Sequence, residues 1–216
     1  MPHEDTSYYY EPLVAAFVSG RLKLDQDKLT TPELIRIGLA SGLRLHKFKR
    51  NIELPRVRSV LGILRGLSPE SLIDIGSGRG TFLWALLDAF PHLAVTALDR
   101  SEKRAADIAA VRRGGIENLS SVLMDAGTLG FADKCVDVVT LLEVLEHMES
   151  PNQAATEAVR VARRFVIASV PSREDTNPEH IQLFDGKSLK GMFLDAGAHS
   201  VKVEYVPNHI IALVKV

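Results

Sequence analysis

The sequence predicts an α/β fold in which a mainly parallel sheet carries helices on both faces. From residue 54 onward, short apolar runs alternate with segments whose apolar residues recur at helical spacing. This alternation is typical of parallel strands joined by right-handed helical crossovers. The last two apolar runs instead flank a Pro207-Asn208 turn, which favours an antiparallel hairpin. A doubly wound sheet that closes with a hairpin is therefore expected.

The helices of this region are predicted from apolar periodicity and from start and stop residues. In the first helix, Val57, Val60 and Leu64 fall on one face. Ser101 is a suitable N-cap for the third helix, and Gly114 begins the Gly-Gly pair that ends it. The expected helices span residues 54–67, 81–89, 101–113, 152–163 and 188–196.

The expected strands span residues 71–75, 94–98, 121–124, 136–142, 165–170, 201–206 and 209–216. The fourth strand is almost wholly apolar, as a central strand of a parallel sheet should be. Cys135 precedes this strand and is expected to be a small buried residue. Trp84, on the helix at 81–89, is expected to pack inside the protein.

Residues 1–53 do not follow this alternation and are expected to form a helical segment beside a domain at 54–216. An apolar stretch at 13–18 precedes a second helix expected at 32–42, which the sequence Thr31-Pro32-Glu33 introduces. Residues 44–50 then hold four Lys or Arg and no acid. This basic run fits either a solvated linker or a surface for phosphate groups.

Composition limits the class of protein. The chain has 216 residues, 46% of them hydrophobic and 25% charged, and a net charge of −1, so no global field draws it to nucleic acid or to a membrane. One cysteine excludes an internal disulfide framework and fits a reducing compartment. No apolar run approaches the ~18 residues of a membrane span. We expect a cytoplasmic monomer or homodimer.

The most informative motif follows the first strand, where residues 72–80 read LIDIGSGRG. Glycine permits positive φ and a close approach of a ligand to the main chain, and a helix that begins after such a loop offers backbone N–H groups. The glycines stand at 76, 78 and 80, and Thr81 occupies the place where a dinucleotide fingerprint needs its third glycine. No Lys-Ser or Lys-Thr follows, which excludes a Walker phosphate loop.

This D-x-G-x-G-x-G loop resembles motif I of the class I S-adenosylmethionine (SAM) dependent methyltransferases, of the type 11/23 kind, over about residues 54–216. The resemblance implies a Rossmann-like, seven-stranded sheet with SAM as the cofactor. It also implies that the N-terminal segment lies over the SAM pocket as a lid.

Three acids stand at the carboxyl ends of successive strands, where open α/β sheets bind ligands. The resemblance implies that Asp99 accepts from the ribose hydroxyls and that Asp125, beside the Ala126 N–H, accepts from the adenine amino group. Asp74 would organise the glycine loop near the methionine ammonium. The expected cofactor-binding residues are Asp74, Gly76, Ser77, Gly78, Gly80, Asp99, Arg100, Asp125, Ala126 and Leu142.

A second motif, E-x-x-E-H, follows the fourth strand. On a helical turn, Glu143, Glu146 and His147 would share one face, and His180 lies in the loop after the fifth strand. These four side chains could hold a divalent metal such as Mn or Mg. The motif resembles the metal motif of ubiquinone-pathway O-methyltransferases and of small-RNA 2′-O-methyltransferases.

A metal-free interpretation remains open, because many small-molecule methyltransferases read E-V-L-E-H-x-x-x-P here, and Pro151 fits. His147 would then act as a general base or pack over the methyl donor. The catalytic candidates are Glu143, His147 and His180. We expect methyl transfer to an oxygen of a small molecule. The alternatives are metal-dependent methylation of RNA ribose and a non-catalytic SAM-binding protein. The histidines at 3, 46, 92, 199 and 209 receive no role.

Overall fold

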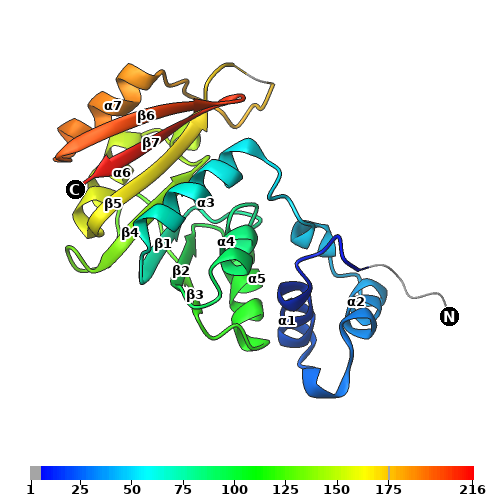
Figure 1. Ribbon diagram of the computed structural model, residues 1–216. Coiled ribbons are helices and arrows are strands. Elements are labelled where there is room, and N and C mark those ends of the chain that lie inside the picture. The colour runs from blue at the N-terminus through cyan, green and yellow to red at the C-terminus, as the bar shows by residue number, and fades with distance from the viewer. Residues whose placement is uncertain (1–5, 175) are drawn as a thin grey trace.

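The computed structural model describes residues 6–174 and 176–216, and a seven-stranded sheet forms its centre (Figure 1). The strands are β1 (Ser71–Ile75), β2 (Ala94–Asp99), β3 (Leu119–Leu123), β4 (Val136–Leu142), β5 (Ala162–Pro171), β6 (Ser200–Val206) and β7 (His209–Lys215). Their order across the sheet is β3-β2-β1-β4-β5-β7-β6. The first five strands pair in parallel, and β7 is antiparallel to both β5 and β6. The predicted sheet and its closing hairpin are confirmed.

Helices cover both faces of the sheet (Figure 1). Those of the core are α3 (Pro55–Leu67), α4 (Leu83–Ala89), α5 (Glu102–Arg113), α6 (Pro151–Val161) and α7 (Gly186–Asp195). Residues of α3, α4 and α5 form one buried cluster with one face of the sheet, and residues of α6 and α7 form another with the opposite face. The neighbours Leu72 and Ile73 of β1 belong to different clusters, because successive side chains of a strand point to opposite faces.

The boundary between α6 and β5 differs from the prediction. The helix ends at Val161 and the strand begins at the next residue, so no loop separates them. Ala162 pairs with Val136 of β4, and the Arg163 guanidinium donates to Asp137 Oδ1 at 2.9 Å. These partners lie outside the local sequence, so helical periodicity through residue 163 could not reveal the early strand.

The two expectations for single core residues have opposite outcomes. Trp84 is 1% exposed and its indole Nε1 donates to the Arg79 carbonyl at 2.9 Å, as a buried tryptophan requires. Cys135 is exposed, so the prediction that it is buried is wrong. The residue precedes the first ladder residue of β4, Val136, and therefore lies outside the part of the strand that the helices cover.

The N-terminal segment contains α1 (Glu11–Leu22), η1 (Gln26–Lys28), α2 (Thr31–Ala40) and η2 (Leu45–Phe48). A Cβ placed on Gly20 of α1 would lie 1.9 Å from the carbonyl oxygen of Ala110 in α5. A Cβ placed on Gly114 would lie 1.9 Å from the carbonyl oxygen of Ala16 in α1. The two backbones therefore touch, and α1 lies beside α5 (Figure 1). The segment shares one buried cluster with the core domain.

No helix in the described ranges, 6–174 and 176–216, is long and apolar enough to cross a membrane.

Candidate active site

A cavity of about 420 Å³ opens where β1, β2, β3 and β4 end. Six of the predicted cofactor residues line it: Gly76, Gly78, Asp99, Arg100, Asp125 and Ala126. Glu143 and His147 also line it. None of residues 6–53 is among the residues that line it. The helix α1, whose apolar residues are buried, packs against α5, and the expectation that the N-terminal segment forms a lid stays a prediction.

A smaller cavity of about 140 Å³ adjoins the first and shares Gly76, Gly78 and Glu143 with it. Three more of the predicted cofactor residues line this smaller cavity, namely Asp74, Ser77 and Leu142. The remaining one, Gly80, lines neither cavity. Nine of the ten predicted cofactor residues therefore line two adjoining cavities at the carboxyl ends of the strands.

Two glycines of the loop differ in the space beside them: Gly78 has room for a ligand, whereas Gly80 packs against Trp84. A Cβ on Gly78, which has a φ of +59°, would meet only the Gly76 carbonyl oxygen at 3.6 Å. Gly78 lines both cavities, so a ligand can approach its main chain closely. A Cβ on Gly80, with a φ of +83°, would instead lie 2.0 Å from the Trp84 ring. Packing against Trp84 therefore requires a glycine at position 80.

The Asp99 carboxylate ties the glycine loop to the end of β2. One of its oxygens accepts from the Gly78 N–H at 2.9 Å and the other from the Ser101 N–H at 2.8 Å. Arg104 lies 3.6 Å from the first oxygen. Each carboxylate oxygen has a second acceptor position. Asp99 can therefore hold the loop and still accept from a pair of ligand hydroxyls.

Asp74 is 3% exposed and lies at the penultimate position of β1. Burial raises the pKa of its carboxyl to about 6, although the Thr140 hydroxyl donates to it at 2.7 Å and opposes the shift. Burial of a carboxylate costs less when a cation lies beside it. A positively charged ligand group in the smaller cavity would therefore favour the ionised form of Asp74.

Asp125, Arg100 and Ala126 also line the larger cavity. Asp125 follows β3, and its Oδ1 accepts from the Gly127 N–H at 2.8 Å, which closes an Asx turn. The second carboxylate oxygen of Asp125 and the exposed Arg100 are polar groups that a ligand in this cavity could contact.

The E-x-x-E-H motif does not form the expected helical face. The 3₁₀ turn η3 (Leu145–His147) begins after Glu143, which has a φ of +59°. This backbone conformation costs roughly 1–2 kcal/mol for a residue with a side chain. It directs Glu143 to other partners, namely the Ser169 hydroxyl at 2.8 Å and His209 Nε2 at 3.0 Å.

His209, the first residue of β7, is the neighbour of Glu143 that the sequence did not reveal. Burial alone would raise the pKa of Glu143, but the hydrogen bond and charge of His209 lower it below its usual range. The same hydrogen bond raises the pKa of His209 against the effect of its own burial. The ring's Nδ1 faces the Pro207 carbonyl at 3.2 Å. Both ring nitrogens thus face acceptors, which favours the imidazolium form.

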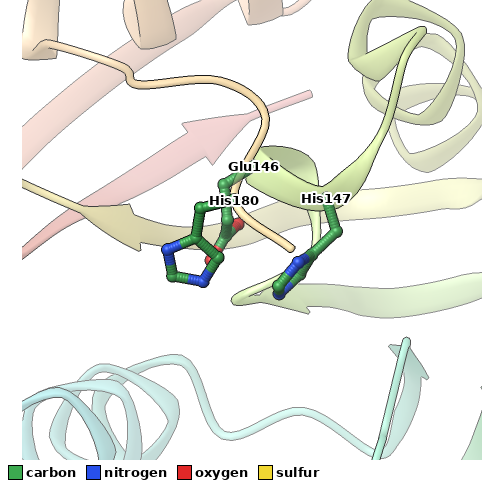
Figure 2. A group of neighbouring side chains, drawn as sticks. All are labelled: Glu146, His147 and His180. Carbon is green, nitrogen blue, oxygen red and sulfur yellow. The ribbon is translucent and has the colours of Figure 1, made fainter. Parts of the chain in front are cut away.

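The second half of the motif does come together with the later histidine. Potential ligand atoms of Glu146, His147 and His180 lie within 4.8 Å of one another. Figure 2 shows the three side chains gathered together, with His147 on η3 and His180 on the loop after β5. The rings of His147 and His180 meet edge to face, with centroids 4.7 Å apart.

Main-chain contacts fix this cluster. The Ile181 N–H donates to the Glu146 carbonyl at 2.9 Å, which ties the loop after β5 to η3. His147 Nδ1 lies 2.9 Å from the Glu179 carbonyl, so Nδ1 carries the proton in the neutral ring. Nε2 is then the nitrogen that can accept a proton or bind a metal.

Arg56 is a further residue that sequence reasoning missed. It is the second residue of α3 and lines the smaller cavity with Asp74 and Glu143. Its positive charge contributes to the lowered pKa of Glu143. The small cavity therefore presents both a cation and carboxylates. The sequence placed Arg56 on a helix but gave no sign that the helix begins beside the glycine loop.

Comparison with known proteins supports the assignment that this geometry suggests. Residues 73–166 match the family described as "Methyltransferase domain". The malonyl-[acyl-carrier protein] O-methyltransferase of Methylococcus capsulatus is 30% identical over 62% of this chain and 50% of its own length. The small RNA 2′-O-methyltransferase of Arabidopsis thaliana is 34% identical over 59% of this chain and 15% of its own. The chain thus spans at most half of either relative.

Solved structures share the fold at low sequence identity. A SAM-dependent methyltransferase from Aquifex aeolicus has a TM-score of 0.62 and 19% identity, over 76% of this chain and 91% of its own. The 1,6-didemethyltoxoflavin-N1-methyltransferase of Burkholderia thailandensis, with bound S-adenosylhomocysteine, has a TM-score of 0.60 and 19% identity. The match covers 74% of this chain and 77% of that protein's chain.

Residues 73–166 thus match a methyltransferase domain, and the fold of the chain is that of solved SAM-dependent methyltransferases.

Proposed function

We propose that this protein transfers the methyl group of SAM to an oxygen of a small molecule. The observation that carries the proposal is the convergence of Asp74, Asp99 and Asp125 with the glycine loop around two adjoining cavities. The ends of three different strands supply these acids, and open α/β sheets bind ligands at such ends.

The residues present fit the parts of SAM. Asp99 would accept from the ribose hydroxyls with its remaining lone pairs, and Asp125 with the Ala126 N–H would bind the adenine edge. In the smaller cavity, Asp74 suits the ammonium of the methionine part and Arg56 suits its carboxylate. Gly78 allows the ligand to pass close to the main chain. When bound, SAM supplies an activated methyl group on a positively charged sulfur.

His147 is the candidate general base. Its ring lines the larger cavity and its Nδ1 is held by the Glu179 carbonyl, so Nε2 can remove a proton from an acceptor hydroxyl. His180 lies beside it and can orient the acceptor. Glu143 is hydrogen-bonded to Ser169 and His209. Because it lines both cavities, its role here is structural.

Incubation with SAM labelled in its methyl group tests this function against separate metabolite and RNA fractions. We expect label in the metabolite fraction, lost with Asp99→Ala and retained with Asp195→Ala, an exposed acid at the end of α7. S-adenosylhomocysteine binding without any transfer would instead favour the non-catalytic alternative.

A second candidate is a metal-dependent RNA ribose 2′-O-methyltransferase. The cluster of Glu146, His147 and His180 favours it, as does the similarity to the Arabidopsis enzyme. One carboxylate and two imidazoles suit Mn, Fe or Zn and leave positions open. Bound there, the metal would lower the pKa of a ribose hydroxyl. Glu143 would have to leave His209 to join this set.

Calorimetric titration of Mn²⁺ into the protein saturated with S-adenosylhomocysteine separates the two candidates. Saturable binding that Glu146→Ala abolishes, together with labelling of RNA, would support the second candidate. Labelling of metabolites without metal binding would support the first, in which His147 acts without an ion.

A further inference from the structure

A second large cavity, of about 480 Å³, lies between the N-terminal segment and the core domain. Phe17 and Arg21 of α1, with the residues around η2, form one wall. The glycine loop, Trp84 and the first turns of α5 form the other. This cavity shares Gly78 and Arg104 with the larger cofactor cavity, so the two adjoin. None of the predicted cofactor acids lines it.

The lining of this cavity is strongly cationic. Its basic residues are Arg21, Arg44, His46, Lys47, Arg79, Lys103 and Arg104. Among the described residues that line the cavity, Asp107 is the only one with a carboxylate, and it lies 2.5 Å from Lys47 Nζ and 3.5 Å from Arg21. One acid therefore neutralises part of the charge of two cations, and the remaining cations share no acid within the cavity.

Among the Lys and Arg side chains of this lining, three have no carboxylate within 4.0 Å in the described ranges 6–174 and 176–216, namely Arg44, Arg79 and Lys103. All three are exposed and can move toward a ligand. Burial lowers the pKa of Lys47, and the charges of Arg21 and Lys103 lower it further, although Asp107 opposes the shift. Repulsion among these cations destabilises the folded protein, and an anion bound in the cavity would relieve that repulsion.

The cavity has an apolar floor below its charged rim. Phe17 and Trp84 are both buried, and Lys47 Nζ lies 4.1 Å from the centroid of the Phe17 ring. Ser101, the N-cap of α5, also lines the cavity, and the N-terminal end of a helix favours an anion. A ligand with a phosphate and a less polar body would match both parts of the lining.

We propose that this cavity binds a phosphate-bearing ligand. Guanidinium groups bind phosphate oxygens through paired hydrogen bonds, which suits Arg44 and Arg79. The volume of about 480 Å³ lies in the range of small-ligand sites. The basic run at 44–50 does not form one continuous phosphate surface, because Lys47 pairs with Asp107 and Arg50 with Asp88. The inference does not depend on methyl transfer.

Calorimetry with inorganic pyrophosphate, and fluorescence anisotropy with labelled oligoribonucleotides of several lengths, test the site. The double variant Arg44→Ala/Lys103→Ala removes two cations that make no ion pair and line only this cavity. Lys190→Ala/Lys202→Ala removes two exposed cations from α7 and β6 as the matched control. We expect the first double variant to bind at least about tenfold more weakly and the control to bind as the wild type does.

The two probes identify the source of the phosphate. Saturable pyrophosphate binding, with no gain in affinity for RNA, would indicate a small phosphorylated ligand. Affinity that rises with oligonucleotide length and falls steeply with salt would indicate an RNA backbone. Either pattern supports the site if Arg44→Ala/Lys103→Ala weakens it. Failure of both probes to bind the wild type, or equal binding by the variant, would overturn it. S-adenosylhomocysteine binding, measured in parallel, shows whether each variant is folded.

Discussion

His209 Nε2 lies 3.0 Å from Glu143 Oε2, which joins the first residue of β7 to the turn after β4. The two side chains are 16% and 23% exposed, so solvent screens their interaction only in part. The Ser169 hydroxyl donates to the other Glu143 oxygen. Glu143 has a left-handed backbone conformation, and these partners keep its carboxylate apart from the rest of the E-x-x-E-H motif.

Replacement of His209 should destabilise the protein. We expect His209→Ala to lower the free energy of unfolding by about 1–3 kcal/mol, because a largely buried carboxylate loses its charged partner. Urea unfolding at pH 6 measures the effect. His199→Ala, which removes an exposed imidazole, is the control and should change little. Equal stability of the two variants would show that the pair contributes nothing.

The contribution of this pair should depend on pH in a definite direction. The pKa of His209 is raised above 6.5, so its stabilisation is complete below pH 6.5 and is lost as pH rises through the raised value. The pKa of Glu143 is lowered below 4.5, so its stabilisation is complete above pH 4.5 and is lost as pH falls through the lowered value. The difference between the wild type and His209→Ala should therefore be greatest between pH 4.5 and 6.5. A difference that grows above pH 8 would be inconsistent with a charged pair.

Gly80 should not tolerate a side chain. A Cβ there would lie 2.0 Å from the Trp84 ring, and the φ of +83° disfavours any other residue. We expect Gly80→Ala to cost about 2 kcal/mol or more in unfolding experiments. In Gly62→Ala, on α3, the new Cβ would meet no atom within 4 Å, and helix propensity should stabilise that variant by up to about 1 kcal/mol. A Gly80→Ala variant as stable as the wild type would contradict the packing described.

The exposed Cys135 should react while the protein is folded. We expect one equivalent of a chromogenic disulfide reagent to be consumed under native conditions, at a rate close to that of the unfolded chain. The reason is that access and not unfolding limits the reaction. Cys135→Ser should consume none. Protection until the protein unfolds would restore the original expectation of a buried cysteine.

Local patterns predicted the order of helices and strands because each element has its own periodicity and its own start or stop residues. The end of α6 escaped prediction because Ala162 joins β5 through pairing with Val136, and no breaker marks the change. The placement of α1 escaped it for a similar reason, since the contact of Gly20 with Ala110 is tertiary.

The sequence predicts those site residues that lie at the ends of strands. It does not predict the position of a side chain that depends on the conformation of a turn. Asp74, Asp99 and Asp125 follow from the positions of the strands. Glu143 departed from the expected face because of its positive φ and because His209, 66 residues away, holds its carboxylate. Nothing in the sequence around either residue indicates that pairing.

Asp99 and the glycine loop should bind the nucleoside part of SAM. Calorimetric titration with S-adenosylhomocysteine measures this binding, on the wild type, Asp99→Ala and the control Asp195→Ala. We expect saturable binding that Asp99→Ala weakens by at least about tenfold and Asp195→Ala leaves unchanged. Absence of binding to the wild type, or full affinity in Asp99→Ala, would contradict it.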